Sequence, residues 1–579
     1  MLGGALMNLS EKKVLLETKL ISSLGKVFPD EVVGKPLKEV SILQNEAVSF
    51  QIAYKSTDTV FPMYVVVETD IRSEYIEEYK VAYVPVENAA TKNSDDLFDR
   101  KTVGMYPDIL LERNVVSDIK NVGFWDNIYT EIGQKNIVNA VPGCYNSIWF
   151  EINPKDGILE SGKHIVTIKF YNSYSNETVA QESININVIP QKLVSQDFIY
   201  TSWFHADCLA DLYGVDVFSD RHFQIMQSFI SEARKHGMNM CLLPAFTPPL
   251  DTPVDMERRT VQLVGVKKQN GEYTFDFSLL VRYINMCLEC GMDYFEHCQL
   301  FTQWGAKHAP KIVAEVDGIE QKIFGWQTDI FDGEYERFLD AYFCKLNPLL
   351  EDLGLSDKVL FHIADEPHEL DTDYYKKASE IINRNVKGNM IGDALSAYKF
   401  YEDGLVKLPI VSITSKDMKK FTENCDYFWI YYCGETMKDG LSNRMISNSS
   451  ARNRILGIQA YVAGAKGFLH WGYNYYYDTL SQGLFDPKIT PCGYCGFTSL
   501  PGAGFVVYPG YDGSAIPSIR MKVFHDAIND YRALMTLEKE IGRNEVFKII
   551  NKHFGDMDFH TKASEQEILL FREEINSRM

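Results

Sequence analysis

The first 190 residues contain short runs in which apolar and polar positions alternate. These runs are SILQNEAVSFQIAY, MYVVVET, YNSIWFEINP, HIVTIKFYN and ESININVIP. Alternation with period 2 over β-branched and aromatic residues indicates strands with one buried face, and turn-forming clusters such as NPKDG and NSYSN separate them. The pattern predicts an antiparallel β-sandwich that ends near Pro190.

From about residue 198 the pattern changes, and short apolar runs alternate with stretches of helical periodicity. The clearest helix is expected at 219–236, with Ser219 or Asp220 as its N-cap and Gly237 as its stop. Other helices are expected before Gly291 and near 334–352. Eight runs are interpreted as strands, namely FIYTSWFH, NMCLLPAF, YFEHCQLF, VLFHIADEP, MIGDALSA, DYFWIYY, GFLHWGYN and FVVYPG.

Eight strands, most of them followed by a helix, predict a (β/α)8 TIM barrel rather than an open sheet. We therefore expect a β-sandwich domain over residues 1–192. A catalytic barrel with a C-terminal helical tail is expected over residues 193–579. An insertion at about 302–332 follows the third strand and is too long and too aromatic for a simple connection. Long loops at the C-terminal face of a barrel usually shape the active site.

The charge balance narrows the possible partners. The chain has 79 acidic and 58 basic residues and a formal net charge of −21. An acidic surface repels nucleic acid and anionic membranes, so neither is expected as a partner. No apolar run approaches the roughly 20 residues of a membrane span, and the N-terminus lacks the basic start and apolar core of a signal peptide. A cytoplasmic protein is expected.

The 11 cysteines are odd in number, and the first 143 residues contain none. This distribution is typical of reduced thiols rather than of a disulfide framework. Two C-x-x-C pairs, Cys287/Cys290 and Cys492/Cys495, lie far apart in the sequence, and the first falls on one face of a predicted helix. We therefore expect neither a metal nor a cofactor.

The fourth predicted strand ends in the adjacent acids Asp365 and Glu366, followed by Pro367. Catalytic groups of TIM barrels lie at the C-terminal ends of strands. Neighbours in a regular strand point to opposite faces, so both acids serve one pocket only if the strand opens there, which Pro367 favours. A solvated acidic loop is the competing interpretation, and the position at the end of strand four favours function.

The residue before the glutamate indicates the class of substrate. Barrel glycosidases commonly place an acid/base glutamate at the end of strand four, and in a large group of retaining enzymes the preceding Asn binds a sugar 2-hydroxyl. Asp365, as a carboxylate, only accepts hydrogen bonds and suits an N–H donor at C2 of the sugar. An acetamido group offers that donor, and its carbonyl oxygen can attack the anomeric carbon to form an oxazolinium-type intermediate.

The seventh predicted strand, GFLHWGYN, carries no carboxylate, whereas a conventional retaining enzyme of that group needs a second Glu there. This absence favours assistance by the substrate, which is a known exception to the two-carboxylate rule. Glu435 and Asp478 lie in nearby loops and remain candidate nucleophiles.

Several segments together resemble glycoside hydrolase family 123. They are HIADEP, WFHADCLADLY, LHWGYN, and YPG followed by SIRMKVFHDAINDYRAL. The resemblance covers nearly the whole chain and implies an exo-acting β-N-acetylgalactosaminidase with substrate-assisted retention. It implies that Asp365 orients and polarises the acetamido group and that Glu366 is the acid/base. The expected partner is a glycan with a terminal β-linked N-acetylhexosamine.

Other candidates for sugar contact come from strand ends and from the insertion. They are Trp203, His205, Asp393, Tyr431, Tyr432, Trp471, Asn474, Tyr508, Trp304, Lys307 and His308. Among them, Trp471 is favoured as a pocket wall and Tyr432 as the holder of the acetamido carbonyl. Core packing is an equally frequent role for aromatic residues of a barrel, and His205 is alternatively a structural histidine.

Two alternatives differ from this interpretation. The first is a conventional retaining or inverting glycosidase that uses Glu366 and a distant carboxylate. The second is a catalytically silent glycan-binding protein, against which the intact Asp-Glu-Pro motif argues. GalNAc and GlcNAc differ at one hydroxyl, and the residues leave both sugars open.

Overall fold

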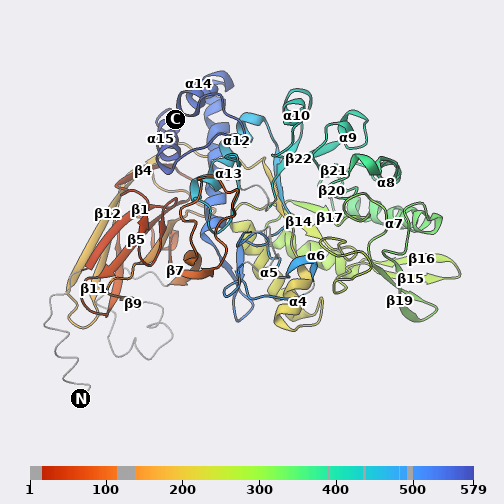
Figure 1. The fold of residues 1–579 in the computed structure, drawn as a ribbon, viewed down its shortest axis with the longest axis horizontal. Helices are drawn as coiled ribbons and strands as arrows, with labels where there is room; N and C mark the ends of the chain where they lie inside the picture. Colours follow the sequence, from red (N-terminus) through yellow and green to blue (C-terminus); the bar gives the residue numbers. More distant parts are fainter. Residues whose placement is uncertain (1–15, 114–136, 389, 434–437, 482, 492–499) are drawn as a thin grey trace, which may run out of the picture. The chain divides into compact units, whose positions relative to one another are not determined.

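The computed structural model describes residues 16–113, 137–388, 390–433, 438–481, 483–491 and 500–579. The chain forms two compact units (Figure 1). The first comprises Met1–Ser195, Lys438–Tyr461 and Pro517–Met579, and the second comprises Gln196–Met437 and Val462–Ile516. The first unit thus contains two segments that follow the boundary at residue 192 in the sequence.

The first unit contains two five-stranded sheets, whose strands run from red to orange in Figure 1. One sheet has the order β1 (Leu16–Ser22), β5 (Val48–Ser56), β10 (Asn146–Ile152), β7 (Ile76–Val86), β8 (Gly104–Arg113). The other has the order β4 (Glu39–Leu43), β12 (Thr178–Ile189), β11 (Gly162–Asn172), β6 (Phe61–Glu68), β9 (Ile137–Ala140). Their pairs are antiparallel except β4 with β12.

The two sheets share one apolar core. Phe50 of β5 is paired with Phe150 of β10, and their rings stack with centroids 5.4 Å apart. Phe170 of β11, from the other sheet, belongs to the same buried cluster. Along β11 the exposed Ile165 stands between buried residues, as period-2 alternation requires. The β-sandwich expected from the alternating pattern is confirmed.

Helices complete this unit. They include α11 (Ser450–Arg454), α13 (Ile519–Ile541), α14 (Arg543–Phe554) and α15 (Glu565–Asn576). Lys522 of α13 donates to Oε2 of the sandwich residue Glu151 at 2.6 Å, and both side chains are buried. Such a pair is costly to break, because either partner alone would leave an uncompensated buried charge.

The second unit is built on a closed barrel of eight parallel strands, which confirms the predicted barrel. Its order is β13 (Ile199–Ser202), β14 (Met240–Leu243), β17 (Tyr294–His297), β20 (Val359–His362), β21 (Met390–Leu395), β22 (Leu408–Ser412), β23 (Trp429–Tyr431) and β24 (Gly467–His470). The first and last strands, β13 and β24, pair in parallel and close the barrel.

The sequence-based numbering of the last three barrel strands is wrong. The sixth strand is β22, a five-residue segment with Pro409 at its second position, and the pattern analysis passed over it because proline is rare inside strands. The DYFWIYY and GFLHWGYN runs therefore supply the seventh and eighth strands. The FVVYPG run forms β25 (Val507–Pro509), which pairs with β26 (Ala515–Pro517) outside the barrel.

Helices follow most barrel strands. They are α4 (Ala206–Tyr213), α5 (Asp220–Lys235), α6 (Ser278–Glu289), α7 (Gly333–Asp352), α8 (Thr372–Asn385), α9 (Lys399–Glu402) and α10 (Met418–Asn424). The Ser219 side chain caps α5 by accepting from the N–H of His222, as expected. None of the helices in the described residues is long and apolar enough to cross a membrane.

The insertion after the third strand has a structure of its own. It contributes the hairpin β18 (Ile312–Val316) and β19 (Ile319–Phe324). The loop after the second strand contributes a second hairpin, β15 (Gly265–Gln269) and β16 (Glu272–Asp276), and β15 pairs with β18. In Figure 1 these strands lie at the outer edge of the barrel unit. The length and aromatic content of the sequence predict the insertion but not its sheet.

Candidate active site

The acid pair lies just beyond a barrel strand that has already ended. Strand β20 stops at His362, and the chain bends at Asp365 and Glu366. Glu366 has a φ of 44°, in the left-handed region that non-glycine residues adopt rarely and mostly at functional sites. This bend removes the strand alternation that would send neighbouring side chains to opposite faces. Asp365 is buried, and Glu366 is partly exposed.

Three hydrogen bonds from backbone N–H groups hold the acid pair and the residue before it. The N–H of Ala364 donates to Oδ2 of Asp393 at 2.8 Å, and the N–H of Glu366 donates to the carbonyl of Ala394 at 3.1 Å. From the insertion, the N–H of Trp304 donates to the carbonyl of Asp365 at 2.8 Å. The neighbouring strand β21 and the insertion therefore hold the acids from two sides.

Tyr431, at the end of β23, binds the second acid directly. Its hydroxyl donates to Oε1 of Glu366 at 2.7 Å. Burial and the negative charge of Glu366 raise the pKa of Tyr431, so its hydroxyl stays protonated and remains a donor. Tyr432, which the sequence analysis favoured, is instead buried with its ring against Phe468 and His470.

Tyr431→Phe is expected to lower kcat about tenfold on substrates with poor leaving groups. A hydrogen bond to a charged group is worth about 1.5–3 kcal/mol, and its loss lets the Glu366 carboxyl rotate away from the departing oxygen. The measurement is kcat for two aryl glycosides whose phenols differ in acidity. An equal loss with both phenols would contradict a role in orienting the acid.

The electrostatics of Asp365 are dominated by its burial. Burial and the negative charges of Glu366 and Asp393 raise the pKa of Asp365, whereas the positive charge of His362 opposes them. Two neighbouring carboxyls with different exposures are the usual means of giving two acids separate roles. The partly exposed Glu366 is the better placed of the two to exchange protons with solvent.

Beneath the acids lies a buried network that the sequence analysis missed. His362 of β20 contacts Glu296 through Nε2 and Asp393 through Nδ1, the latter at 3.4 Å. Glu296 also accepts from the Trp203 indole N–H at 2.5 Å and from the Thr201 hydroxyl at 2.7 Å. These side chains are at most 4 % exposed, so the network is closed to solvent. The sequence signal for this network was the presence of two polar residues, His362 and Glu296, inside short apolar strand segments.

His205 and Asn474 are hydrogen-bonded to each other and do not point into an accessible pocket. Oδ1 of Asn474 accepts from the N–H of His205 at 2.8 Å, and its Nδ2 donates to the His205 carbonyl at 3.1 Å. The His205 ring contacts the Trp471 carbonyl and Arg258, which forms a buried ion pair with Asp207. Burial and the charge of Arg258 lower the pKa of His205 to about 3, so its imidazole is neutral.

The remaining candidates separate into buried and accessible groups. Trp203, Asp393 and Tyr508 are buried, and the Asp393 oxygens already accept from Ala364, Ala394 and the Tyr375 hydroxyl. Trp471 is partly exposed, and Trp304 is 47 % exposed. In the insertion, Lys307 pairs with Asp371 at 2.8 Å, and the His308 ring packs against Trp326. Trp304 and Trp471 are thus the accessible indoles among the candidates.

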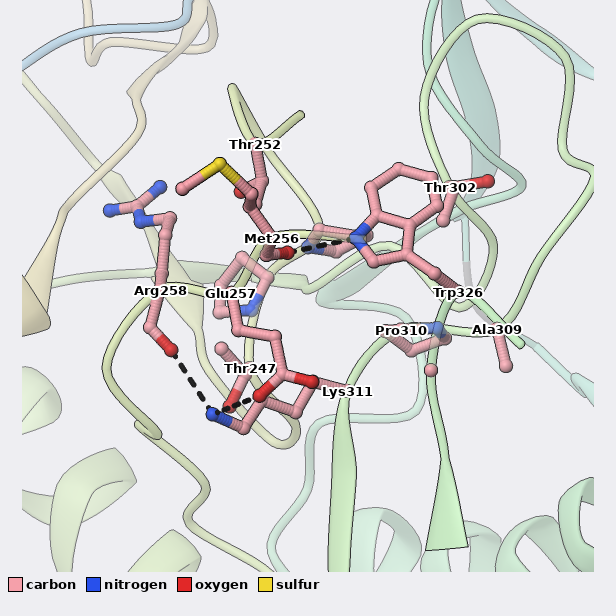
Figure 2. A pocket seen from close by; sticks show the side chains of 13 residues that line it. Thr247, Thr252, Met256, Glu257, Arg258, Thr302, Ala309, Pro310, Lys311 and Trp326 are labelled. Atoms are coloured by element: carbon pink, nitrogen blue, oxygen red, sulfur yellow. Dashed lines mark hydrogen bonds and ion pairs between the residues drawn. The ribbon is translucent and has the colours of Figure 1, made fainter. Parts of the chain in front are cut away.

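A pocket between the loops after the second and third strands adjoins this region (Figure 2). Trp326 closes it by donating its indole N–H to the Met256 carbonyl at 3.0 Å. On the other side, Lys311 contacts Glu257 at 3.0 Å and the Arg258 carbonyl at 3.2 Å. Arg258, which lines this pocket, contacts the ring of His205 after the first barrel strand through its guanidinium group.

The alternative nucleophiles have different surroundings. Oδ1 of Asp478 accepts from the N–H of Gly483 at 2.7 Å, within its own loop. Glu435 lies outside the described residues, as does the Cys492/Cys495 pair. In the sequence, Glu435 comes four residues after the end of β23, which is the seventh strand. The absence of a carboxylate from GFLHWGYN therefore concerns the eighth strand and does not bear on a nucleophile at strand seven.

One family model matches the chain, and a solved structure of the same family shares its fold. The model of the glycoside hydrolase 123 catalytic domain matches residues 203–537, more than half of the chain. A family 123 glycoside hydrolase from Clostridium perfringens, whose structure was analysed for glycolipid glycan hydrolysis, superposes with a TM-score of 0.71. The match covers 97 % of this chain and 98 % of that chain at 13 % identity, which shows the shared fold.

Some of the matching structures are much less similar. A family 39 glycoside hydrolase from Bacteroides cellulosilyticus reaches a TM-score of 0.30 at 8 % identity, over 86 % of this chain and 82 % of that chain. A score this low carries no argument about function. The search of curated protein sequences found no match.

Proposed function

The chain belongs to glycoside hydrolase family 123, and from this premise we propose that it is a retaining exo-β-N-acetylgalactosaminidase whose nucleophile is the substrate's own acetamido oxygen. The proposed substrates are glycans or glycolipids with a terminal β-linked GalNAc. The observation that carries the proposal is the buried Asp365 directly before the partly exposed Glu366 in a family 123 barrel.

In the first step, Glu366 gives its proton to the glycosidic oxygen. The acetamido carbonyl oxygen attacks C1 as the C1–oxygen bond breaks, which gives an oxazolinium and the free alcohol. Positive charge develops on the acetamido nitrogen, and the Asp365 carboxylate accepts the hydrogen bond from that N–H. Electrostatic stabilisation of developing charge by a fixed group is the usual source of most of the rate enhancement.

In the second step, the Glu366 carboxylate takes a proton from water as the water attacks C1. The oxazolinium ring opens and restores the acetamido group, and Glu366 is again protonated. Each step inverts C1, so the product keeps the β configuration. Tyr431 supports both steps, because its hydroxyl holds the Glu366 carboxyl in either protonation state.

The sugar and the class of protein are tested by hydrolysis of the 4-nitrophenyl β-glycosides of GalNAc, GlcNAc, Gal and Glc side by side. GalNAc should be released fastest, and the two sugars without an acetamido group should react very slowly. Rapid release of Gal or Glc would favour the conventional mechanism. Hydrolysis of none of the four would favour a glycan-binding protein.

The nucleophile is tested by placing fluorine stepwise on the acetamido methyl group. Fluorine withdraws electron density from the attacking oxygen, so kcat should fall steeply with each substitution. A protein carboxylate would scarcely respond, because it attacks C1 without that oxygen. Glu435→Gln tests the conventional alternative, because such an enzyme would have its nucleophile after β23, the seventh strand. A flat response to fluorine, together with loss of activity in Glu435→Gln, would replace our mechanism.

A further inference from the structure

The barrel interior contains a charged cluster that the proposed reaction does not use directly. It consists of Glu296, His362 and Asp393, on the strands β17, β20 and β21. All three side chains are fully buried. Burying three ionisable groups together is expensive unless their charges are paired and their hydrogen bonds satisfied. A cluster buried at that cost, and bonded through Asp393 to the residue before the acid pair, calls for a functional explanation.

Hydrogen bonds connect the cluster to the residue before the acid pair and to the buried Trp203. On one side, the Asp393 carboxylate holds the N–H of Ala364, the residue before Asp365, at 2.8 Å. On the other side, Glu296 holds the indole of Trp203 at the end of β13. Because β14 stands between β13 and β17 in the barrel, the Glu296 contacts to Thr201 and Trp203 cross the barrel interior.

We propose that His362 is a positioning residue for this reaction: clamped between Glu296 and Asp393, it supplies the positive charge that lets Asp365 act as a carboxylate. This inference rests on the proposed function, because it assumes that Asp365 must be ionised to accept the acetamido N–H. His362 itself touches neither the substrate nor the departing oxygen in this scheme. Its positive charge acts on Asp365 through space, and its partner Asp393 also holds the backbone N–H of Ala364, the residue before Asp365.

The charge balance supports this role. Burial alone would lower the pKa of His362, but the carboxylates of Glu296 and Asp393 outweigh it and raise that pKa to about 10. Of the charged groups in the described part of the chain that act most strongly on Asp365, Glu366, Asp393 and Glu296 raise its pKa and His362 lowers it. Without the imidazolium, four carboxyls would face one another with no counter-charge among those groups.

The other titratable groups around the cluster are neutral at physiological pH. Tyr375 of α8 donates to Asp393 at 3.0 Å, and burial raises its pKa. Tyr431 of β23 donates to Glu366 and stays protonated. Burial lowers the pKa of His297, the neighbour of Glu296 on β17, to about 4, so this ring adds no charge.

The test is the pH profile of kcat/KM for His362→Gln with the aryl glycoside that the wild type hydrolyses best. Activity requires ionised Asp365, so it falls as the pH drops through the pKa of this residue. Removing the cation raises that pKa, and the acidic limb should move to higher pH by about one unit. Asp393→Asn removes an anion but keeps an oxygen for the Ala364 N–H, so its acidic limb should move to lower pH.

Tyr375→Phe is the matched control, because it removes a hydrogen bond from the same cluster without changing its charge. Whatever its effect on the rate, its acidic limb should stay in place. Acidic limbs that do not move in His362→Gln and Asp393→Asn, or that move in the same direction, would overturn the proposal. A purely structural role predicts acidic limbs that stay in place, since lost packing lowers the rate at every pH.

A second measurement does not depend on turnover. In the wild type, the imidazole nitrogens of His362 should show the NMR shifts of a doubly protonated ring at pH 8, identified as the signal missing from His362→Gln. A neutral ring at pH 8 would overturn the proposal even if no variant were active. If the wild type cleaves none of the four aryl glycosides, the proposed function fails, and this titration still decides the charge of His362.

Discussion

Glu366→Gln is expected to lower kcat by about 10²–10⁴-fold on a disaccharide with a terminal β-GalNAc, because general acid catalysis typically contributes that much. The amide occupies the space of the carboxyl and can still accept the Tyr431 hydroxyl. It cannot give a proton to the departing oxygen. From a 2,4-dinitrophenyl glycoside, the phenolate departs without protonation. The rate of the first step should therefore fall much less for the variant on that substrate.

The matched control is Glu369→Gln, which changes an exposed glutamate three residues further along the same loop and should behave as the wild type. Azide provides a second check. It attacks the oxazolinium without needing a general base, so it should accelerate Glu366→Gln on the activated substrate and yield a β-glycosyl azide. Wild-type turnover of the disaccharide by Glu366→Gln would remove this residue from the mechanism.

The series of strands explains why the Asp-Glu pair could be placed in the fold from the sequence. The Asp-Glu-Pro motif follows an apolar run, and its place in the series of βα units put it at the fourth strand, which the structure confirms. Strands before residue 395 have clear boundaries, and their count was correct up to that point. The count failed at Leu408–Ser412, since a five-residue strand containing Pro409 gives little periodic signal.

The residues that hold the acid pair in place were harder to predict from the sequence, for a different reason. His362 contacts Glu296, 66 positions earlier, and Asp393, 31 positions later. Local periodicity describes which face a residue occupies but not which side chain meets it across a barrel. Similarly, Tyr431 and Tyr432 are adjacent and chemically identical. Their side chains point in different directions from the end of β23, so Tyr431 reaches Glu366 while Tyr432 packs against Phe468.

Asp365→Asn should separate the roles of the two acids. The asparagine amide can turn its NH₂ group, a donor, towards the acetamido N–H. It is also uncharged and cannot offset the positive charge of the oxazolinium. Removing one such stabilising group typically costs about 10²–10³ in kcat. The loss should persist with 2,4-dinitrophenol as the leaving group, because cyclisation is slowed rather than protonation of the departing oxygen. Asp373→Asn, an exposed change at the start of α8, is the control.

Asp365→Asn should lower the activity but should not lower the stability of the protein. Burial and nearby carboxylates raise the pKa of Asp365, so its ionised form destabilises the folded state at any pH above that pKa. Asn carries no charge to bury, and Asp365→Asn should therefore have a Tm at pH 8 equal to or above that of the wild type. A lower Tm would mean that lost activity reflects damage to the fold. Recovery of the first step with the better leaving group, as expected for Glu366→Gln, would show that the two acids do not have separate roles. A slow variant with an undiminished Tm, and no recovery with 2,4-dinitrophenol, would identify Asp365 as a residue kept for the reaction at a cost to the fold.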